Sequence, residues 1–135
     1  MNKKIVGIVC VAIVLLIAFT GLSDSGIDES LISQTIFVDA VYEPENNIVR
    51  IKYVDSSEMT RLVTLEILGM EKTFHKEFLQ QSFVETVQIN SMPQYGWATM
   101  PVIFTLDHEE FGKISLKTEI HLSDEMKPRV IYSKI

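Results

Sequence analysis

Three histidines and one acidic cluster are the side chains in this sequence that most resemble metal ligands. His75, His108 and His121 are far apart, and none has another histidine two or four positions away. A metal site needs several donors that converge on one point. Ligand types come together in Asp107-His108-Glu109-Glu110, just before Phe111-Gly112, where a hairpin turn is expected. We interpret this cluster as a solvated acidic turn, with weak binding of calcium or another divalent ion as the alternative.

Methionine thioethers suggest a second metal chemistry, because they bind Cu(I) in oxidising compartments. The chain has 6 methionines, but none forms a Met-x-Met or Met-x-x-Met pattern. Its one cysteine, Cys10, lies inside an apolar run, so the rest of the chain lacks the thiolate that a blue-copper centre requires. Cys10 is not a lipoprotein acylation site either, because Val9 precedes it and the apolar run continues beyond it. We predict no cofactor and no metal ligand.

The sequence contains no pattern typical of an enzyme. It has no Gly-x-Ser-x-Gly motif, no glycine-rich phosphate loop and no cysteine nucleophile outside the apolar run. Glu109 and Glu110 are adjacent, so on a strand they would point to opposite faces, which does not favour a catalytic pair of carboxylates. We therefore predict that the chain is not an enzyme and has no catalytic residues.

Net charge excludes one class of partner. Of the 12 basic residues, Lys3 and Lys4 precede the apolar run, which leaves 10 basic residues against 18 acidic ones in the remainder. An acidic domain repels phosphate backbones, so we expect no nucleic-acid partner. The same charge argues against adsorption of the domain to an anionic lipid surface.

One segment carries the residue types that anchor contacts between proteins. Met92-Pro93-Gln94-Tyr95-Gly96-Trp97 joins two expected strands and places Tyr95 and Trp97 on either side of a glycine. Large aromatic side chains in a loop can supply much of the energy of a protein contact. Tyr95 and Trp97 are therefore the candidate partner-contact residues. The alternative for Trp97 is that its ring folds back and closes the open end of the core.

The first 22 residues predict how the chain is attached to a membrane. Residues 1–4 are a short basic start, and residues 5–22 contain no charge. At about 1.5 Å per residue, a helix of this length spans roughly 27 Å, close to the thickness of the hydrocarbon core of a bilayer. After Lys4 the next basic residue is Arg50, whereas Asp24 and Asp28 follow directly. This asymmetry places the N-terminus in the cytoplasm and the remaining chain outside.

We interpret residues 5–22 as a retained transmembrane signal-anchor that crosses the cell membrane once. Cleavage is one alternative and would give a secreted domain, since Ala18/Thr20 and Gly21/Ser23 are acceptable small pairs. A pilin-like leader, whose apolar helix becomes an assembly spine, is another, although Lys4-Ile5 lacks the small residue expected at such a cleavage site. Residues 23–33 are polar and small, and they predict a tether between membrane and domain.

From residue 34 to residue 135, apolar residues recur with a period of two, which is typical of strands with one buried face. Turn signals such as Glu43-Pro44-Glu45-Asn46-Asn47 separate the strands. The clearest strand places Ile120 and Leu122 inward and His121 outward. The expected strands cover residues 36–42, 48–55, 60–68, 73–79, 83–89, 102–106, 114–122 and 130–135. The expected core includes Val49, Ile51, Val63, Leu65, Val102, Phe104, Leu116 and Ile120.

Two of these segments also fit a helix. Residues 57–70 place Met59, Val63 and Ile67 at helical spacing, and residues 73–81 could form a helical turn. We favour strands because β-branched residues recur and no neighbouring segment supports a layer of helices.

Seven to eight short strands in the domain indicate an all-β fold, an antiparallel β-sandwich that follows one N-terminal transmembrane helix. The architecture resembles immunoglobulin-like and fibronectin-type domains, although the Cys–Trp–Cys signature is missing. A fold of this kind does not define a function. The leading interpretation is a membrane-anchored extracytoplasmic module that binds another protein, as an interaction or accessory subunit. The alternative is an extracytoplasmic metal-binding or sensing domain that uses His and Met side chains.

Overall fold

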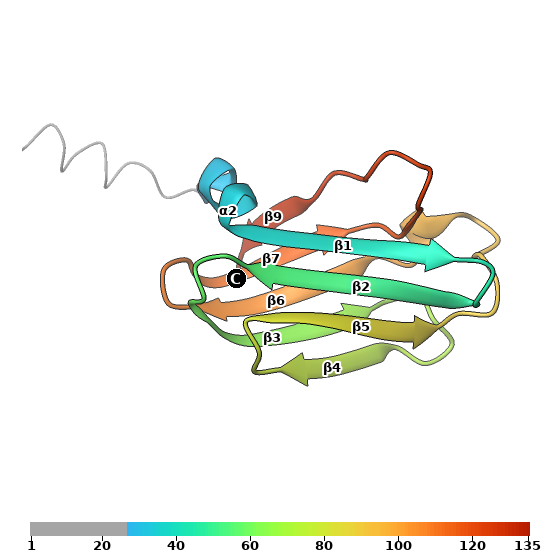
Figure 1. The fold of residues 1–135 in the computed structure, drawn as a ribbon, viewed down its shortest axis with the longest axis horizontal. Coiled ribbons are helices and arrows are strands. Elements are labelled where there is room, and N and C mark those ends of the chain that lie inside the picture. Colours follow the sequence, from blue (N-terminus) through green and yellow to red (C-terminus); the bar gives the residue numbers. More distant parts are fainter. Residues whose placement is uncertain (1–26) are drawn as a thin grey trace, which may run out of the picture.

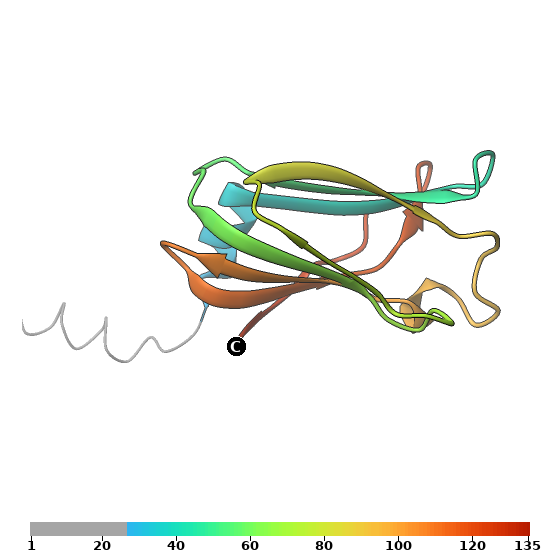
Figure 2. The same cartoon turned by 90° about the horizontal axis from the view of Figure 1, so that it is seen from below.

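Residues 27–135 are described by a computed structural model, and they form two β-sheets packed face to face (Figures 1 and 2). The predicted signal-anchor, residues 5–22, and the first part of the predicted tether lie outside the described residues. Within residues 27–135, no helix has the length and apolar character needed to cross a membrane.

One sheet has four strands in the order β5-β2-β1-β8, and the other has five in the order β4-β3-β6-β7-β9. The strands are β1 Ile36–Glu43, β2 Ile48–Asp55, β3 Thr60–Ile67, β4 Phe74–Phe78, β5 Ser82–Gln88, β6 Val102–His108, β7 Gly112–Thr118, β8 His121–Leu122 and β9 Ile131–Lys134. Neighbouring strands are antiparallel, except that β1 and β8 pair in parallel through Val41↔His121 and Tyr42↔Leu122.

The period of two in the sequence builds this sandwich. In β1, for example, Ile36, Val38, Ala40 and Tyr42 are buried, while the residues between them are exposed or half-buried. All eight residues expected in the core are buried, none with more than 1% exposure. The β-sandwich prediction is confirmed, with nine strands in the described residues and one parallel pair. The segments that also fitted helices contain strands β3 and β4 instead.

A short helix occupies the end of the segment that we expected to be only a tether. Helix α2 covers Glu29–Thr35, and the Asp28 side chain caps it by accepting a hydrogen bond from the Leu31 N–H at 3.1 Å. Ile32 is 1% exposed, so the helix contributes to the core. This helix could not be predicted from the pattern of apolar residues, because a single buried residue produces no helical period.

The alternation fails where the chain passes from β7 to β8. The strand predicted over residues 114–122 divides into β7 in the five-stranded sheet and β8 in the four-stranded sheet. Because the chain changes sheets between them, alternation no longer predicts which side chains are buried. His121, which we expected to point outward, is only 6% exposed, and this expectation was wrong.

The two ends of the sandwich carry different connections (Figures 1 and 2). The α2 end contains helix α2, the β2–β3 and β6–β7 turns and the C-terminus. The loop end contains the β1–β2 hairpin, the β3–β4 connection and the long connection of residues 89–101.

The connection of residues 89–101 is held tightly against the loop end. It includes a 3-10 helix, η1 Trp97–Thr99, and the Leu68 N–H donates to the Pro101 carbonyl at 3.1 Å. Gly69 has a φ of +81°, and a Cβ at this position would clash with the Thr99 carbonyl oxygen. Only glycine therefore allows the two connections to approach this closely.

Replacing Gly69 with alanine should destabilise the domain much more than Gly112→Ala. Both glycines have a positive φ, which costs an L side chain about 1–2 kcal/mol, but no atom lies within 4 Å of a Cβ added at Gly112. At Gly69 the Thr99 backbone must move as well, so we expect a further loss of roughly 1–3 kcal/mol. Urea unfolding of the two variants measures the difference, and equal losses would contradict the close packing.

Candidate functional site

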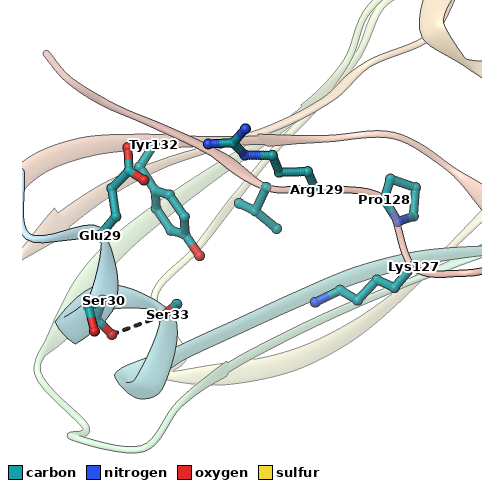
Figure 3. Close-up of a pocket in the computed structure, with 8 residues that line it drawn as sticks. Glu29, Ser30, Ser33, Lys127, Pro128, Arg129 and Tyr132 are labelled. Atoms are coloured by element: carbon teal, nitrogen blue, oxygen red, sulfur yellow. Dashed lines mark hydrogen bonds between the residues drawn. The ribbon is translucent and has the colours of Figure 1, made fainter.

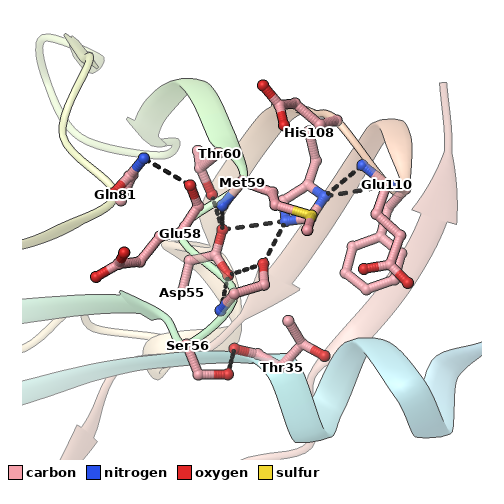
Figure 4. Close-up of polar contacts among 12 residues, drawn as sticks. Thr35, Asp55, Ser56, Glu58, Met59, Thr60, Gln81, His108 and Glu110 are labelled. Atoms are coloured by element: carbon pink, nitrogen blue, oxygen red, sulfur yellow. Dashed lines mark hydrogen bonds and ion pairs between the residues drawn. The ribbon is translucent and has the colours of Figure 1, made fainter.

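A cluster of buried polar side chains joins the two sheets at the α2 end (Figure 4). Asp55 ends β2, Thr60 begins β3 and His108 ends β6, so the ends of strands from both sheets meet here. The side chains of Asp55 and His108 are both 0% exposed, and His108 Nε2 lies 3.0 Å from Asp55 Oδ2. This cluster is the strongest candidate for chemistry among the described residues.

The Asp55 carboxylate faces five hydrogen-bond donors. Oδ1 accepts from the Ser57 backbone N–H at 2.9 Å and from the Ser57 hydroxyl at 2.6 Å. Oδ2 accepts from the Met59 N–H at 3.1 Å, the Thr60 hydroxyl at 2.6 Å and His108 Nε2 at 3.0 Å. Burial by itself raises the pKa of Asp55, but the hydrogen bonds from Ser57 and Thr60 outweigh it and hold the pKa below its ordinary value. The carboxylate is therefore ionised inside the domain.

Backbone groups determine which nitrogen of His108 carries the proton. Nδ1 accepts from the N–H groups of Glu110 at 3.1 Å and Phe111 at 3.2 Å, so it carries no proton. The ring is therefore neutral and donates from Nε2 to Asp55. The solvated turn predicted here is correct for Glu109 and Glu110, which are exposed, but wrong for His108, which is 1% exposed. The period of two in β6 extends to His108 and places its side chain on the buried face.

Asp55, His108 and Ser57 are the residue types of a hydrolytic triad, but their arrangement does not activate Ser57. A triad needs the carboxylate and the hydroxyl on opposite nitrogens of the histidine. Here Ser57 Oγ lies 3.2 Å from Nε2, the nitrogen that also contacts Asp55. Nδ1 is occupied by two backbone N–H groups, and the Ser57 hydroxyl donates to Asp55. The arrangement holds the ends of β2, β3 and β6 together.

The turn that follows Asp55 connects this cluster to its surroundings (Figure 4). The backbone N–H and the hydroxyl of Ser56 donate to the Thr35 carbonyl, at 2.9 and 3.0 Å, and thereby fix the end of α2. Gln81 Nε2, in the β4–β5 connection, donates to the Glu58 carbonyl at 2.6 Å. The β2–β3 turn therefore links the end of α2 and the β4–β5 connection to the buried Asp55 carboxylate.

Tyr53 extends the cluster into the core. Its hydroxyl lies 2.7 Å from the Thr60 hydroxyl, which gives its own proton to Asp55, so Tyr53 is the donor. Burial raises the pKa of Tyr53 above its ordinary value, and the hydroxyl stays neutral. The Tyr53 ring lies 5.3 Å from the ring of Phe83 and 6.0 Å from that of Phe104, on β6 of the other sheet.

The other two histidines lie elsewhere. His121 Nε2 is 2.7 Å from Asp39 Oδ1 and its Nδ1 is 2.7 Å from the Leu122 carbonyl, so both ring nitrogens face acceptors. His75 is exposed and lies 3.7 Å from Glu66. In the part of the chain that the structure describes, no group of three or more His, Cys, Asp or Glu residues is placed to hold a metal ion.

Tyr95 and Trp97, the candidate partner-contact residues, occupy opposite environments. Tyr95 is 82% exposed, whereas Trp97 is 9% exposed and its ring packs 5.1 Å from the Tyr42 ring. The Trp97 Nε1 atom is buried and has no hydrogen-bond partner among the described residues. Trp97 thus closes the loop end of the core while Tyr95 is displayed beside it. A partner contact at either residue stays a prediction.

Asp55→Asn should destabilise the domain by roughly 3 kcal/mol or more at neutral pH, because several buried donors lose a charged acceptor. The pKa of Asp55 is lowered by folding. Its stabilisation is therefore present above the unfolded value of about 3.9 and is lost as the pH falls through the folded value. Urea unfolding at pH 7 and near pH 3 measures both effects, with Asp107→Asn as the half-exposed control. A difference between wild type and Asp55→Asn that is the same at both pH values would disprove the charged state.

No protein-family model, curated protein sequence or solved structure matches this chain. A functional conclusion therefore depends on the geometry of its own residues.

Proposed function

We propose that this protein is a non-catalytic interaction module, held outside the cell membrane by residues 5–22, that presents its loop end to a partner protein. The observation that carries the proposal is an exposed tyrosine on a firmly held loop. Tyr95 is 82% exposed, while its neighbour Trp97 is buried in the core. An aromatic side chain on an ordered loop loses little conformational entropy when it binds.

Hydrogen bonds within the connection support this order. The Gly96 N–H donates to the Pro93 carbonyl at 3.1 Å, and the Met100 N–H donates to the Trp97 carbonyl at 3.0 Å. The Gly96 carbonyl accepts from both the backbone N–H and the hydroxyl of Thr99, at 3.2 and 2.7 Å. Together with the contact between Thr99 and Gly69, these bonds favour one conformation of the loop.

The position of the loop also suits a partner away from the lipid. The described chain begins at the α2 end, and residues 89–101 lie at the opposite end of the strands (Figures 1 and 2). A strand of 8 residues such as β1 spans about 26 Å at 3.3 Å per residue. An anchor at residues 5–22 would therefore hold the α2 end near the membrane and point Tyr95 outward.

Within the class of β-sandwiches we propose an immunoglobulin-like or fibronectin-type arrangement. The order β5-β2-β1 in one sheet and β3-β6-β7 in the other corresponds to strands E-B-A and C-F-G of immunoglobulin domains. Strand β4 lies beside β3, and strands β8 and β9 are additions to this plan. In variable immunoglobulin domains the recognition loops include B–C and F–G, which correspond to the β2–β3 and β6–β7 turns at the α2 end. The contact proposed at residues 89–101 therefore uses the opposite end of the sandwich.

A photocrosslinking side chain at residue 95 should capture a partner in the native membrane, whereas the same group at residue 79 should not. Leu79 is the matched control, because it is 78% exposed but belongs to the connection between β4 and β5, which lies at the α2 end (Figure 1). In the protein without the photocrosslinking group, Tyr95→Ala should weaken binding of the captured partner by at least tenfold, since a hot-spot residue contributes about 2 kcal/mol or more, and should leave the thermal midpoint unchanged. Identical adducts at both positions, or none at residue 95, would refute a contact at the loop end.

Protease added to intact cells should digest residues 27–135, because the charge asymmetry around residues 5–22 directs the C-terminus outward. Alkaline extraction should leave the full-length protein in the membrane pellet. Full protection until the cells are lysed would reverse the topology. A soluble product that begins near residue 21 or 24 would show a cleaved signal peptide in place of the anchor.

A further inference from the structure

One edge of strand β1 is covered by a short and weakly attached segment. β2 pairs with all of β1, but on the opposite side only Val41 and Tyr42 pair with a strand, β8. In the described chain, residues 36–40 therefore have no strand partner on that side. Residues 123–130, which we call the strap, run beside this edge before the chain enters β9 (Figure 1).

The strap is loosely packed. Residues 123–127 are exposed, and Met126 is 92% exposed. A groove of about 420 Å³ separates the strap from α2, with Ser30 and Ser33 on one side and Lys127 and Tyr132 on the other (Figure 3). A second groove, of about 440 Å³, borders the strap at Pro128 and Arg129. Residues 123–127 of the strap thus bury little surface, whereas Val130 packs against the core.

The His121 side chain makes the polar contact between β8 and β1. Its Nε2 contacts Asp39 Oδ1 on β1 at 2.7 Å, and its Nδ1 contacts the Leu122 carbonyl at 2.7 Å. The β1–β8 ladder has only two residue pairs, and parallel pairing is slightly less stable per residue than antiparallel pairing. Further along, the Lys127 ammonium lies over the exposed ring of Phe37, 4.3 Å from its centroid. Removing the His121 contact would leave the cover with few bonds to β1.

The opposite side of the sandwich is closed in a different way. There the edge strands β4 and β5, one from each sheet, lie next to each other, and the rings of Phe78 and Phe83 are stacked with their centroids 3.7 Å apart. Lys76 and Glu85 form an ion pair of 2.8 Å between the two sheets. In the described chain, the edges of β4 and β5 are therefore protected by side-chain contacts and not by a separate covering segment.

We propose that β8 and the strap are a removable cover, latched by His121 and Asp39, and that an extended segment of a partner protein displaces them and adds to β1 as a strand. This inference rests on the proposed function as an interaction module and names a second mode of contact. Main-chain hydrogen bonds along β1 would hold the incoming strand. Ile120 and Leu122, which pack against the core around β8, indicate that this strand needs apolar side chains at alternate positions.

His121→Phe tests the latch, because it keeps an aromatic ring and removes both nitrogen contacts. His75→Phe is the matched control at an exposed histidine. In the full-length chain in nanodiscs, hydrogen exchange of His121→Phe should be at least tenfold faster in the paired residues of the β1–β8 ladder, 41–42 and 121–122, and unchanged in β3 and β6. A synthetic peptide with the sequence of residues 117–124 should bind this variant at least tenfold more tightly than it binds wild type or His75→Phe. A scrambled peptide should bind none of them.

Unchanged exchange in residues 41–42 and 121–122 would show that His121 is not a latch. Faster exchange throughout both sheets would show a general loss of stability in place of a local opening. Local opening without binding of the peptide would show that the edge of β1 does not accept a strand. Each of these results overturns the inference, and none affects crosslinking through residue 95 at the loop end, which tests the proposed function separately.

Discussion

The burial of one ionised carboxylate constrains the whole α2 end of this protein. Moving a charge out of water costs several kcal/mol unless hydrogen bonds replace its hydration. For Asp55 the replacement is complete only when Ser57, Thr60 and His108 stand in one arrangement. That arrangement fixes the β2–β3 turn and sets the distance between the sheets. It also places Ser56 where it can bind the end of α2.

The buried charge of Asp55 also explains why His108 and Ser57, which have reactive side chains, stabilise the fold. His108 donates to the carboxylate with one nitrogen, and backbone N–H groups saturate the other. Ser57 gives its proton to Asp55 and has no base to accept it. Each polar atom is committed to a neighbour, and this is the opposite of an active site, which keeps one reactive group available. The two features for which we propose recognition, Tyr95 and the strap, lie outside this cluster.

The strands and the core could be predicted from the sequence because the alternation of apolar and polar residues is a property of each strand by itself. It could not predict the Asp55–His108 pair, whose partners are 53 positions apart and whose contact depends on how the sheets stack. The burial of His121 was missed for a related reason, since the change of sheet after Thr118 leaves no mark on the pattern of apolar residues. Helix α2 escaped notice because Ile32 alone connects it to the core. Trp97 was the exception, since closure of the core by its ring was one of two alternatives stated from the sequence.

The parallel pairing of β1 and β8 also determines the order in which the chain can fold as it is synthesised. β1 and β2 form a hairpin as soon as residue 55 is available, but Asp39 meets His121 only 82 positions further along. Until then the outer edge of β1 is bare, in a nascent chain that already carries folded strands. Contacts of such long range form slowly, and an uncovered edge is where two immature chains join most easily. The segment that contains β8 therefore shields this edge from other copies of the chain, and the time needed to synthesise residues 56–122 sets how long the edge is uncovered.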